Sequence, residues 1–240
     1  MNNNVVESFP IAPRNWELVL EAYHFSAPYN YAVIDNFLYP DACHELHQEL
    51  LTHAGWRYQE HLENPVLSNM KPEIETIFSI AESLRAYCPS LLSGYELVSH
   101  WALMYPKNAP GKVHSDIGAI TLNIWLTPDE YNLDSTSGGL IFFDVKRQCE
   151  AAENKSISYL WSEQYMKDFT QGQKISVNYK WNRALLFDAK TFHQTDSFCF
   201  ANLTPGSQRI NLSLAFDNPK LHRERVDELK KILTSDSNGT

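Results

Sequence analysis

Six segments rich in β-branched and aromatic residues fill the second half of the chain, and this feature most restricts how the chain can fold. They are YELVSHWALMY (95–105), AITLNIWLT (119–127), GGLIFFDV (138–145), KISVNYKW (174–181), RALLFDA (183–189) and RINLSLAF (209–216). Short runs of this composition predict β-strands. Because few helical segments separate them, the pattern predicts an antiparallel β architecture and not a series of β-α-β units.

Helical patterns lie mainly at the two ends of the chain. Residues 1–30 contain three prolines and predict short, irregular structure. Residues 31–34 predict a strand, followed by a helix that starts near Pro40, where proline suits the first turn. Residues 71–89 predict an amphipathic helix that stops at Pro89, and residues 220–233 predict a terminal helix.

A chain of 240 residues is suited to one domain. We therefore predict a single, mainly β domain with flanking helices over residues 1–240. Within it, residues 1–94 supply an N-terminal strand and helical support, residues 95–217 the β core, and residues 218–240 a C-terminal helix and tail.

Two of the predicted strands each have one apolar and one polar face. Since successive side chains of a strand point to opposite sides, the alternation separates two sets of residues. The apolar set is Ile120, Leu122, Ile124 and Leu126, with Ile210, Leu212, Leu214 and Phe216. The other set is Thr121, Asn123 and Trp125, with Arg209, Asn211 and Ser213. The apolar set suits packing under helices and the other set suits a cavity wall, where Arg209 needs an anion.

Composition excludes several kinds of protein. The formal net charge is −9 and no block of Lys and Arg occurs, which disfavours nucleic-acid binding. The four cysteines form no CxxC pair, so free thiols in a reducing compartment are expected. The start of the chain lacks the pattern of a signal peptide, and no apolar run is long enough to span a membrane. We therefore expect a cytoplasmic protein without a membrane partner.

Three residues of the β-rich half have the side chains of a metal site. His114 and Asp116 lie two apart before one predicted strand, and His193 lies in a polar loop after a later strand. Two imidazoles and one carboxylate are the facial triad that binds non-haem Fe(II) and leaves positions open for other ligands. Taken separately, each residue would be an ordinary polar loop residue; their order along the predicted strands favours a metal.

With these residues, the chain resembles the Fe(II)- and 2-oxoglutarate-dependent oxygenases of the prolyl-4-hydroxylase-like branch. The matching positions are His114-Ser115-Asp116, Gly138-Gly139-Leu140, His193 and Arg209, with Tyr105 nine residues before His114. The segment YAVIDNFLYPDACHEL also resembles the opening strand and helix of these enzymes, and the similarity covers about residues 31–217. In one departure, Asn211 stands where the family often has Ser or Thr. The resemblance implies a double-stranded β-helix (jelly-roll) core with N-terminal helices packed on one sheet.

The resemblance also implies the cofactors and the reaction. Fe(II), held by His114, Asp116 and His193, would use O2 and the co-substrate 2-oxoglutarate to hydroxylate an unactivated C–H bond. Arg209 would pair with the distal carboxylate of 2-oxoglutarate, since a guanidinium can bind a carboxylate through two hydrogen bonds. The other expected pocket residues are Asn123, Tyr105, Trp125 and Asn211. The substrate would be a small molecule, an amino acid or a peptide. A carboxylate at position 116 argues against halogenation, which needs that coordination position.

Other classes of protein fit the pattern less well. A cupin-like metal-binding barrel, acting as an isomerase or a ligand-binding protein, would use different metal ligands and would not need Arg209. A barrel kept only as a binding scaffold would not need an intact triad. A serine hydrolase is disfavoured because no GxSxG motif occurs.

Residues 147–175 form a long connection between two predicted strands. The connection is much longer than an ordinary hairpin loop, and its second part carries several aromatic residues. Long insertions in compact domains are often lids or binding loops. We therefore expect this segment to close over the iron pocket and to contribute to substrate choice.

Overall fold

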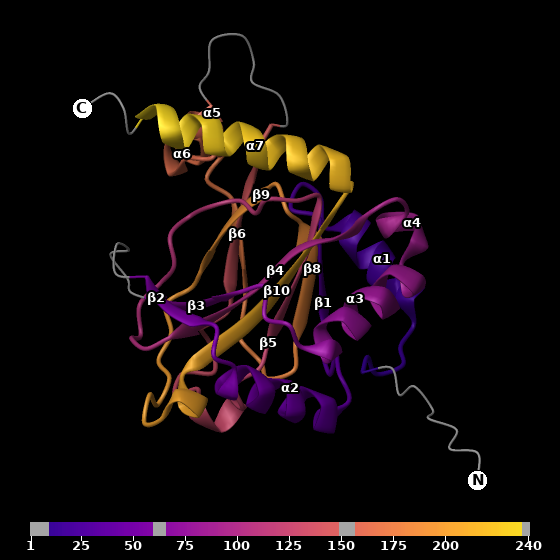
Figure 1. Cartoon of the computed structure of the whole chain (residues 1–240), viewed down its shortest axis with the longest axis vertical. Helices are drawn as coiled ribbons and strands as arrows, with labels where there is room; N and C mark the ends of the chain where they lie inside the picture. Colours follow the sequence, from indigo (N-terminus) through magenta and orange to yellow (C-terminus); the bar gives the residue numbers. More distant parts are fainter. Residues whose placement is uncertain (1–9, 60–65, 149–156, 237–240) are drawn as a thin grey trace.

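The strands form two antiparallel sheets. The computed structural model describes residues 10–59, 66–148 and 157–236 (Figure 1). The larger sheet has the order β1 (Tyr31–Ile34), β8 (Ala184–Asp188), β5 (Ile120–Trp125), β10 (Arg209–Asp217), β4 (Glu96–Tyr105), β3 (Val66–Met70) and β2 (Trp56–Gln59). The smaller sheet has the order β7 (Lys174–Val177), β6 (Leu140–Lys146) and β9 (Thr191–Thr195). Each of the six predicted segments contains a strand and every pairing is antiparallel, so the predicted mainly β, antiparallel architecture is confirmed.

Helices flank the sheets. They are α1 (Trp16–Phe25), α2 (Pro40–Thr52), α3 (Glu75–Tyr87), α4 (Pro89–Leu92), α5 (Ile157–Leu160), α6 (Glu163–Phe169) and α7 (Pro219–Asp236), with short 3-10 turns at Asp129–Tyr131 and Pro205–Ser207. Figure 1 shows α1, α3 and α4 grouped along one side of the sheets and α7 lying across one end. The helix predicted over 71–89 is α3, which ends at Tyr87, just before Pro89; Pro89 then begins the short helix α4.

The prediction of irregular structure over residues 1–30 is wrong for Trp16–Phe25, which form α1, while residues 1–9 lie outside the described part of the chain. Asn15 caps this helix, its side-chain oxygen accepting hydrogen bonds from the backbone N–H groups of Glu17 and Leu18. The prolines at 13 and 28 flank the ten-residue helix and do not interrupt it. The two prolines therefore lie on either side of a helix and do not indicate that a helix is absent.

The two faces of the larger sheet differ as the alternation predicted. The apolar side chains of β5 and β10 lie in one buried cluster with side chains of α2 and α3, including Leu46, Ile77 and Ile80. The opposite face turns toward the smaller sheet, where Trp125 and Phe187 lie in a second cluster with Phe142 of β6. The space between the sheets is thus lined by one face of each.

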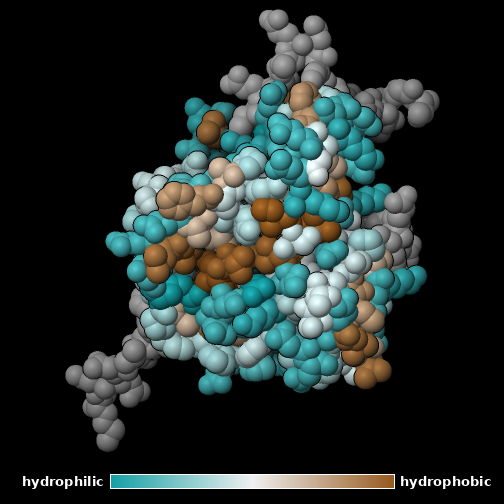
Figure 2. Space-filling view, turned by 180° about the vertical axis from the view of Figure 1, so that it is seen from behind, coloured by the Kyte–Doolittle hydropathy of each residue, from teal (hydrophilic) through white to brown (hydrophobic). Residues whose placement is uncertain are grey.

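The face seen from behind Figure 1 is largely polar, with a band of hydrophobic side chains across its middle (Figure 2). Among the helices that the structure describes, none combines the length and apolar character needed to cross a bilayer.

Candidate metal centre and adjoining pocket

The backbone brings the two candidate histidines opposite each other. His114 lies outside the regular strands, but its N–H donates to the carbonyl of His193 at 2.9 Å. The N–H of His193 donates back to the carbonyl of His114 at 2.8 Å. His193 lies on strand β9 and not in a loop as predicted. Its neighbour Phe192 points outward into an apolar cluster, so His193 points into the space between the sheets.

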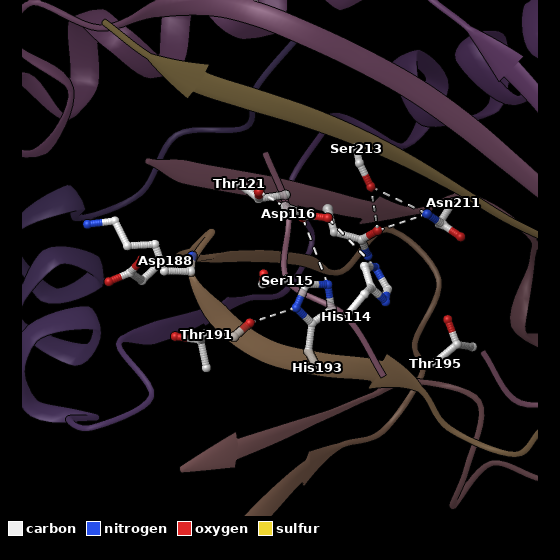
Figure 3. A network of polar contacts seen from close by, with 12 residues as sticks. His114, Ser115, Asp116, Thr121, Asp188, Thr191, His193, Thr195, Asn211 and Ser213 are labelled. Carbon is white, nitrogen blue, oxygen red and sulfur yellow. Dashed lines mark hydrogen bonds and ion pairs between the residues drawn. The ribbon is translucent and has the colours of Figure 1, made fainter. Parts of the chain in front are cut away.

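His114, Asp116 and His193 converge on one point. One donor atom from each lies within 4.8 Å of the other two. The Asp116 carboxylate lies between the rings, with Oδ1 3.7 Å from Nε2 of His114 and Oδ2 3.8 Å from Nε2 of His193 (Figure 3). These separations suit three ligands around one ion, since each exceeds the length of a direct hydrogen bond.

Both imidazoles are oriented by backbone carbonyls. Nδ1 of His114 lies 2.8 Å from the carbonyl of Lys112, and Nδ1 of His193 lies 2.9 Å from the carbonyl of Thr191. Since a carbonyl can only accept, each Nδ1 is the donor in these contacts, which leaves Nε2 as the nitrogen that a neutral ring can offer to a metal. Nε2 is the atom that faces Asp116 in both residues, so both rings present a metal-binding nitrogen to the same point.

Asp116 is held from its side chain and from its backbone. The hydroxyl of Thr121 donates to Oδ2 at 2.9 Å, and the backbone N–H of Asp116 donates to the carbonyl of Ala189 at 2.8 Å. The residue is only 7% exposed. A buried carboxylate with one hydrogen-bond donor and two imidazole nitrogens beside it is suited to a cation.

Burial keeps His193 neutral. Its desolvation, together with the nearby His114, lowers the pKa of His193 to about 4. A neutral imidazole is the form that binds a metal. The side chain of His114 is more accessible, with 51% of it exposed. Two histidines and one carboxylate fit Fe(II), which accepts nitrogen and oxygen donors in this combination.

A pocket adjoins the triad between the two sheets. Its other lining residues are Trp101, Leu103, Tyr105, Asn123, Leu140, Phe187, Thr195, Asn211 and Ser213. The polar members form a connected group, in which Oδ1 of Asn123 accepts from Nδ2 of Asn211 at 2.9 Å and from the Ser213 hydroxyl at 3.1 Å. Nδ2 of Asn123 is buried and has no hydrogen-bond partner among the described residues. This amide is therefore a free donor beside the triad.

Arg209 lies behind the polar wall and is fully buried. Its Nε donates to the carbonyl of Gly138 at 2.7 Å and its Nη1 to Oδ1 of Asn211 at 3.0 Å. Nη2 has no hydrogen-bond partner in the part of the chain that the structure describes, and no carboxylate there forms an ion pair with the guanidinium. A buried cation with an unused donor is costly, so this position is suited to an anionic ligand.

The glycine pair noted in the sequence supports Arg209. A side chain at Gly139 would place its Cβ 1.7 Å from the carbonyl oxygen of Val177, so only glycine fits between the strands. Gly138 has a φ of +82°, which favours glycine, and its carbonyl accepts the hydrogen bond from Arg209. The motif thus lets β6 approach β7 while presenting a carbonyl to the guanidinium.

The structure brings most of the predicted pocket residues together. Tyr105, Asn123 and Asn211 line the pocket with the triad, and the ring of Tyr105 lies 5.0 Å from the centre of the Arg209 guanidinium. Trp125 lies behind the pocket surface, fully buried and stacked on Tyr179 with ring centroids 5.1 Å apart.

Sequence reasoning missed several residues of the site. Thr121 was placed on the correct face of its strand but was given no role, although it holds Asp116. Trp101 and Leu103 line the pocket from the same face of β4 as Tyr105. Their alternation within WALMY was the available signal. Thr195 was missed because β9 was predicted as a loop; its hydroxyl lies 3.2 Å from that of Tyr105.

The expectation that residues 147–175 form a lid is wrong for the part that the structure describes. Tyr165 and Met166 of α6 pack with Phe192 and Val145 on the outer face of the smaller sheet, opposite to His193. None of the described residues of this segment lines the pocket. Residues 149–156 lie outside the described part of the chain. The aromatic residues of the insertion therefore serve mainly to cover the outside of β6 and β9.

The fold is shared with solved structures of one class of enzyme. SnoN, a non-haem α-ketoglutarate-dependent epimerase from nogalamycin biosynthesis, aligns with a TM-score of 0.60 and 14% identity over 85% of this chain and 83% of its own. A prolyl-4-hydroxylase from Pseudomonas putida aligns with a TM-score of 0.54 and 12% identity over 83% and 98%. The chain has the fold of the 2-oxoglutarate- and iron-dependent oxygenases.

A third structure of this oxygenase fold was solved with ligands. HygX from Streptomyces hygroscopicus, with nickel, 2-oxoglutarate and hygromycin B bound, aligns with a TM-score of 0.54 and 10% identity over 82% of this chain and 86% of its own. No protein-family model matches the chain, and no curated protein matches it. The similarity to the oxygenase fold therefore rests on structure and on the convergence of His114, Asp116 and His193.

Proposed function

We propose that this protein is a non-haem Fe(II) oxygenase that uses 2-oxoglutarate as its co-substrate. One observation carries the proposal: a His-Asp-His triad lines the pocket between the two sheets, and a fully buried arginine, without an ion-pair partner among the described residues, lies behind the same pocket in contact with its wall residue Asn211. The triad requires a cation, and the arginine requires an anion. 2-Oxoglutarate has a carboxylate at each end, so one molecule can serve both positions.

Iron is assigned to His114, Asp116 and His193. Backbone carbonyls orient the two imidazoles and the Thr121 hydroxyl orients the carboxylate, so both Nε2 atoms and the carboxylate face one point before any ligand arrives. When bound, the iron supplies the activation of O2 that is coupled to decarboxylation of 2-oxoglutarate. The protein contributes the orientation of the three ligands and a site shielded from water on the His193 side, where exposure is 3%.

The distal carboxylate of 2-oxoglutarate is assigned to Arg209. The free Nη2 of this residue is a charge-assisted donor, and Asn211 fixes the guanidinium plane through Nη1. Nδ2 of Asn123 is a second unused donor in the same wall. Tyr105 borders the same region, and Trp125 supports the wall from behind by stacking on Tyr179.

The reaction that we propose is hydroxylation of an unactivated C–H bond. One 2-oxoglutarate, one O2 and one substrate R–H would give succinate, CO2 and R–OH, with one oxygen atom entering each oxidised product. Relatives in fold include an epimerase and a carbocyclase, so the oxidative outcome is the finer part of the proposal. A cupin-like barrel without oxygenase activity is disfavoured by Arg209, since such a protein has no use for a buried cation beside its metal.

The substrate is proposed to be a small molecule, an amino acid or a peptide. Apart from the triad, the residues that line the pocket are all uncharged. An apolar or aromatic group can pack against Trp101 and Leu103 of β4, while a charged group would find no counter-ion on this wall.

Turnover of 2-oxoglutarate tests the proposal. The protein, with Fe(II), ascorbate, 2-oxoglutarate and a panel of candidate substrates, should release succinate, and mass spectrometry should find a product heavier by one oxygen. Asp116→Ala should release none, while the control His24→Ala, on the exposed side of α1, should match the parent protein. Succinate release with a product of unchanged mass, or with a dehydrogenated product, would support the assignment as a 2-oxoglutarate-dependent enzyme but contradict hydroxylation as its reaction. Fe(II)-independent conversion of a substrate would contradict the oxygenase itself.

A further inference from the structure

Arg147 connects the end of β6 to the loop that carries Asp116. Its side chain is 4% exposed and extends away from the pocket interior toward Ser115. Nε donates to the Ser115 hydroxyl at 3.1 Å, and Nη2 donates to the backbone carbonyl of Asp116 at 3.2 Å. Ser115 lies between His114 and Asp116, the two metal-ligand candidates of this loop, in the sequence. The guanidinium therefore fixes the backbone of the loop at Asp116, the residue that would bind iron.

The backbone of Arg147 binds the second segment that carries a metal-ligand candidate, the turn before β9. Its N–H donates to the carbonyl of Lys190 at 2.8 Å, in the turn that leads into β9 and His193. The preceding residue of this turn, Ala189, accepts the hydrogen bond from the N–H of Asp116 at 2.8 Å. Arg147 thus joins the two segments that supply all three ligands.

The long insertion covers the other face of the guanidinium. The centre of the Arg147 guanidinium lies 3.6 Å from the centroid of the Trp161 ring, in the short link between α5 and α6. Trp161 also packs against the cluster that contains Phe192 and Met166. A cation over an indole face is a favourable contact that also excludes water. The insertion therefore holds Arg147 in place from outside the sheet.

We propose that Arg147 and Trp161 form a clamp that positions the metal ligands, so that the insertion controls metal affinity from the outer side of the sheet. This inference rests on the proposed iron site. Neither residue contacts the ion, and both act by fixing the Ser115–Asp116 peptide relative to the turn before β9. Thr121 orients the carboxylate of Asp116, whereas Arg147 fixes its backbone, so the two residues hold different parts of the same ligand.

Four variants separate this role from a purely structural one. Arg147→Lys keeps the charge but loses the fork that bonds Ser115 and Asp116 together. Ser115→Ala removes one of the two contacts with little change in volume. Trp161→Leu keeps an apolar contact but removes the ring, and Trp161→Phe restores a weaker π face. The matched control is Arg183→Lys, because Arg183 also donates through Nε and Nη2, but to the carboxylate of Asp35 instead of the ligand segments.

Anaerobic calorimetry with Fe(II) is the test, combined with thermal unfolding of each metal-free variant. At a temperature at which every variant is folded, Arg147→Lys, Ser115→Ala and Trp161→Leu should bind Fe(II) about 10- to 100-fold more weakly than the parent, the usual effect of removing a contact that orients a ligand. Trp161→Phe should bind with intermediate affinity, and Arg183→Lys should bind as the parent does.

Parental Fe(II) affinity in folded Arg147→Lys and Ser115→Ala would overturn the clamp. If Arg147→Lys does not fold, Ser115→Ala alone decides. A parent protein that itself fails to bind Fe(II) would contradict the proposed function, whereas a parent that binds and variants that bind equally well would contradict only the clamp.

Discussion

Replacing Arg209 with alanine should abolish tight binding of 2-oxoglutarate and leave metal binding intact. The residue is fully buried, and its Nη2 has no hydrogen-bond partner among the residues described. Its contacts with Gly138 and Asn211 hold it behind the pocket, and it makes no contact with the triad. The carboxylate of a bound 2-oxoglutarate would be left without its buried counter-ion in the variant.

The expected loss follows from the burial. Truncating one partner of a buried, hydrogen-bonded charge pair costs about 2–5 kcal/mol. At about 1.4 kcal/mol for each factor of ten, the dissociation constant should rise by about thirty-fold to a few thousand-fold. Arg209→Lys should recover only part of this loss, since an ammonium group lacks the planar fork. Without 2-oxoglutarate, Arg209→Met should unfold at a temperature equal to or above that of the parent, because a buried cation lacking an anion is itself unfavourable.

Anaerobic calorimetry, with Mn(II) in place of Fe(II), measures both ligands. 2-Oxoglutarate should also raise the unfolding temperature of the parent and have little effect on Arg209→Ala, since only a ligand that binds the folded state stabilises it. A variant that binds 2-oxoglutarate as tightly as the parent would refute the assignment. A variant that loses Mn(II) as well would show that Arg209 supports the metal site instead.

The remaining predictions concern the triad, the glycine pair and a buried histidine. His193→Ala should lose Fe(II) binding in calorimetry, and parental affinity in this variant would remove His193 from the site. Gly139→Ala should lower the free energy of unfolding, measured in urea, by about 1–3 kcal/mol or more, because its Cβ would overlap the Val177 carbonyl, and an unchanged midpoint would contradict this close approach. Burial, with nearby His44, lowers the pKa of His47 from 6.5 to about 4, so the folded state resists its protonation. The stability that neutral His47 contributes is present above about pH 6.5 and is lost as the pH falls toward 4. In urea titrations, the free energy of unfolding of His47→Leu should therefore fall less than that of the parent between these two pH values. An equal fall in both proteins would contradict this prediction.

The two faces of the central strands could be predicted from the sequence because each strand alternates strictly. Ile210 and Leu214 lie in the core beneath the helices, while Arg209 and Asn211 face the other sheet, as the period of two requires. Arg209 could be predicted for the same reason, since it is a charged residue on the polar face of a strand, whereas the His-x-Asp pair could be predicted from two metal-ligand side chains that stand two residues apart before a strand.

Strand β9 escaped prediction because its two faces are unusual. His193 and Thr195 line the pocket, so the inward face is polar, whereas Phe192 points outward and is covered by the insertion. A strand whose apolar face depends on a distant segment resembles a polar loop in the sequence. The role of Arg147 could not be predicted for a related reason, since its partners Ser115, Lys190 and Trp161 are brought together only by the folded chain.

The central claim is that one pocket binds a metal and 2-oxoglutarate together. The most direct test is the affinity for 2-oxoglutarate, measured anaerobically by calorimetry with and without Fe(II), in the parent and in Asp116→Ala. If the triad and Arg209 hold opposite ends of the same molecule, Fe(II) should strengthen 2-oxoglutarate binding by at least about tenfold in the parent, equivalent to about 1.4 kcal/mol of coupling, and should have no effect in Asp116→Ala. An affinity for 2-oxoglutarate that is the same with and without Fe(II), or no binding in either condition, would contradict the account.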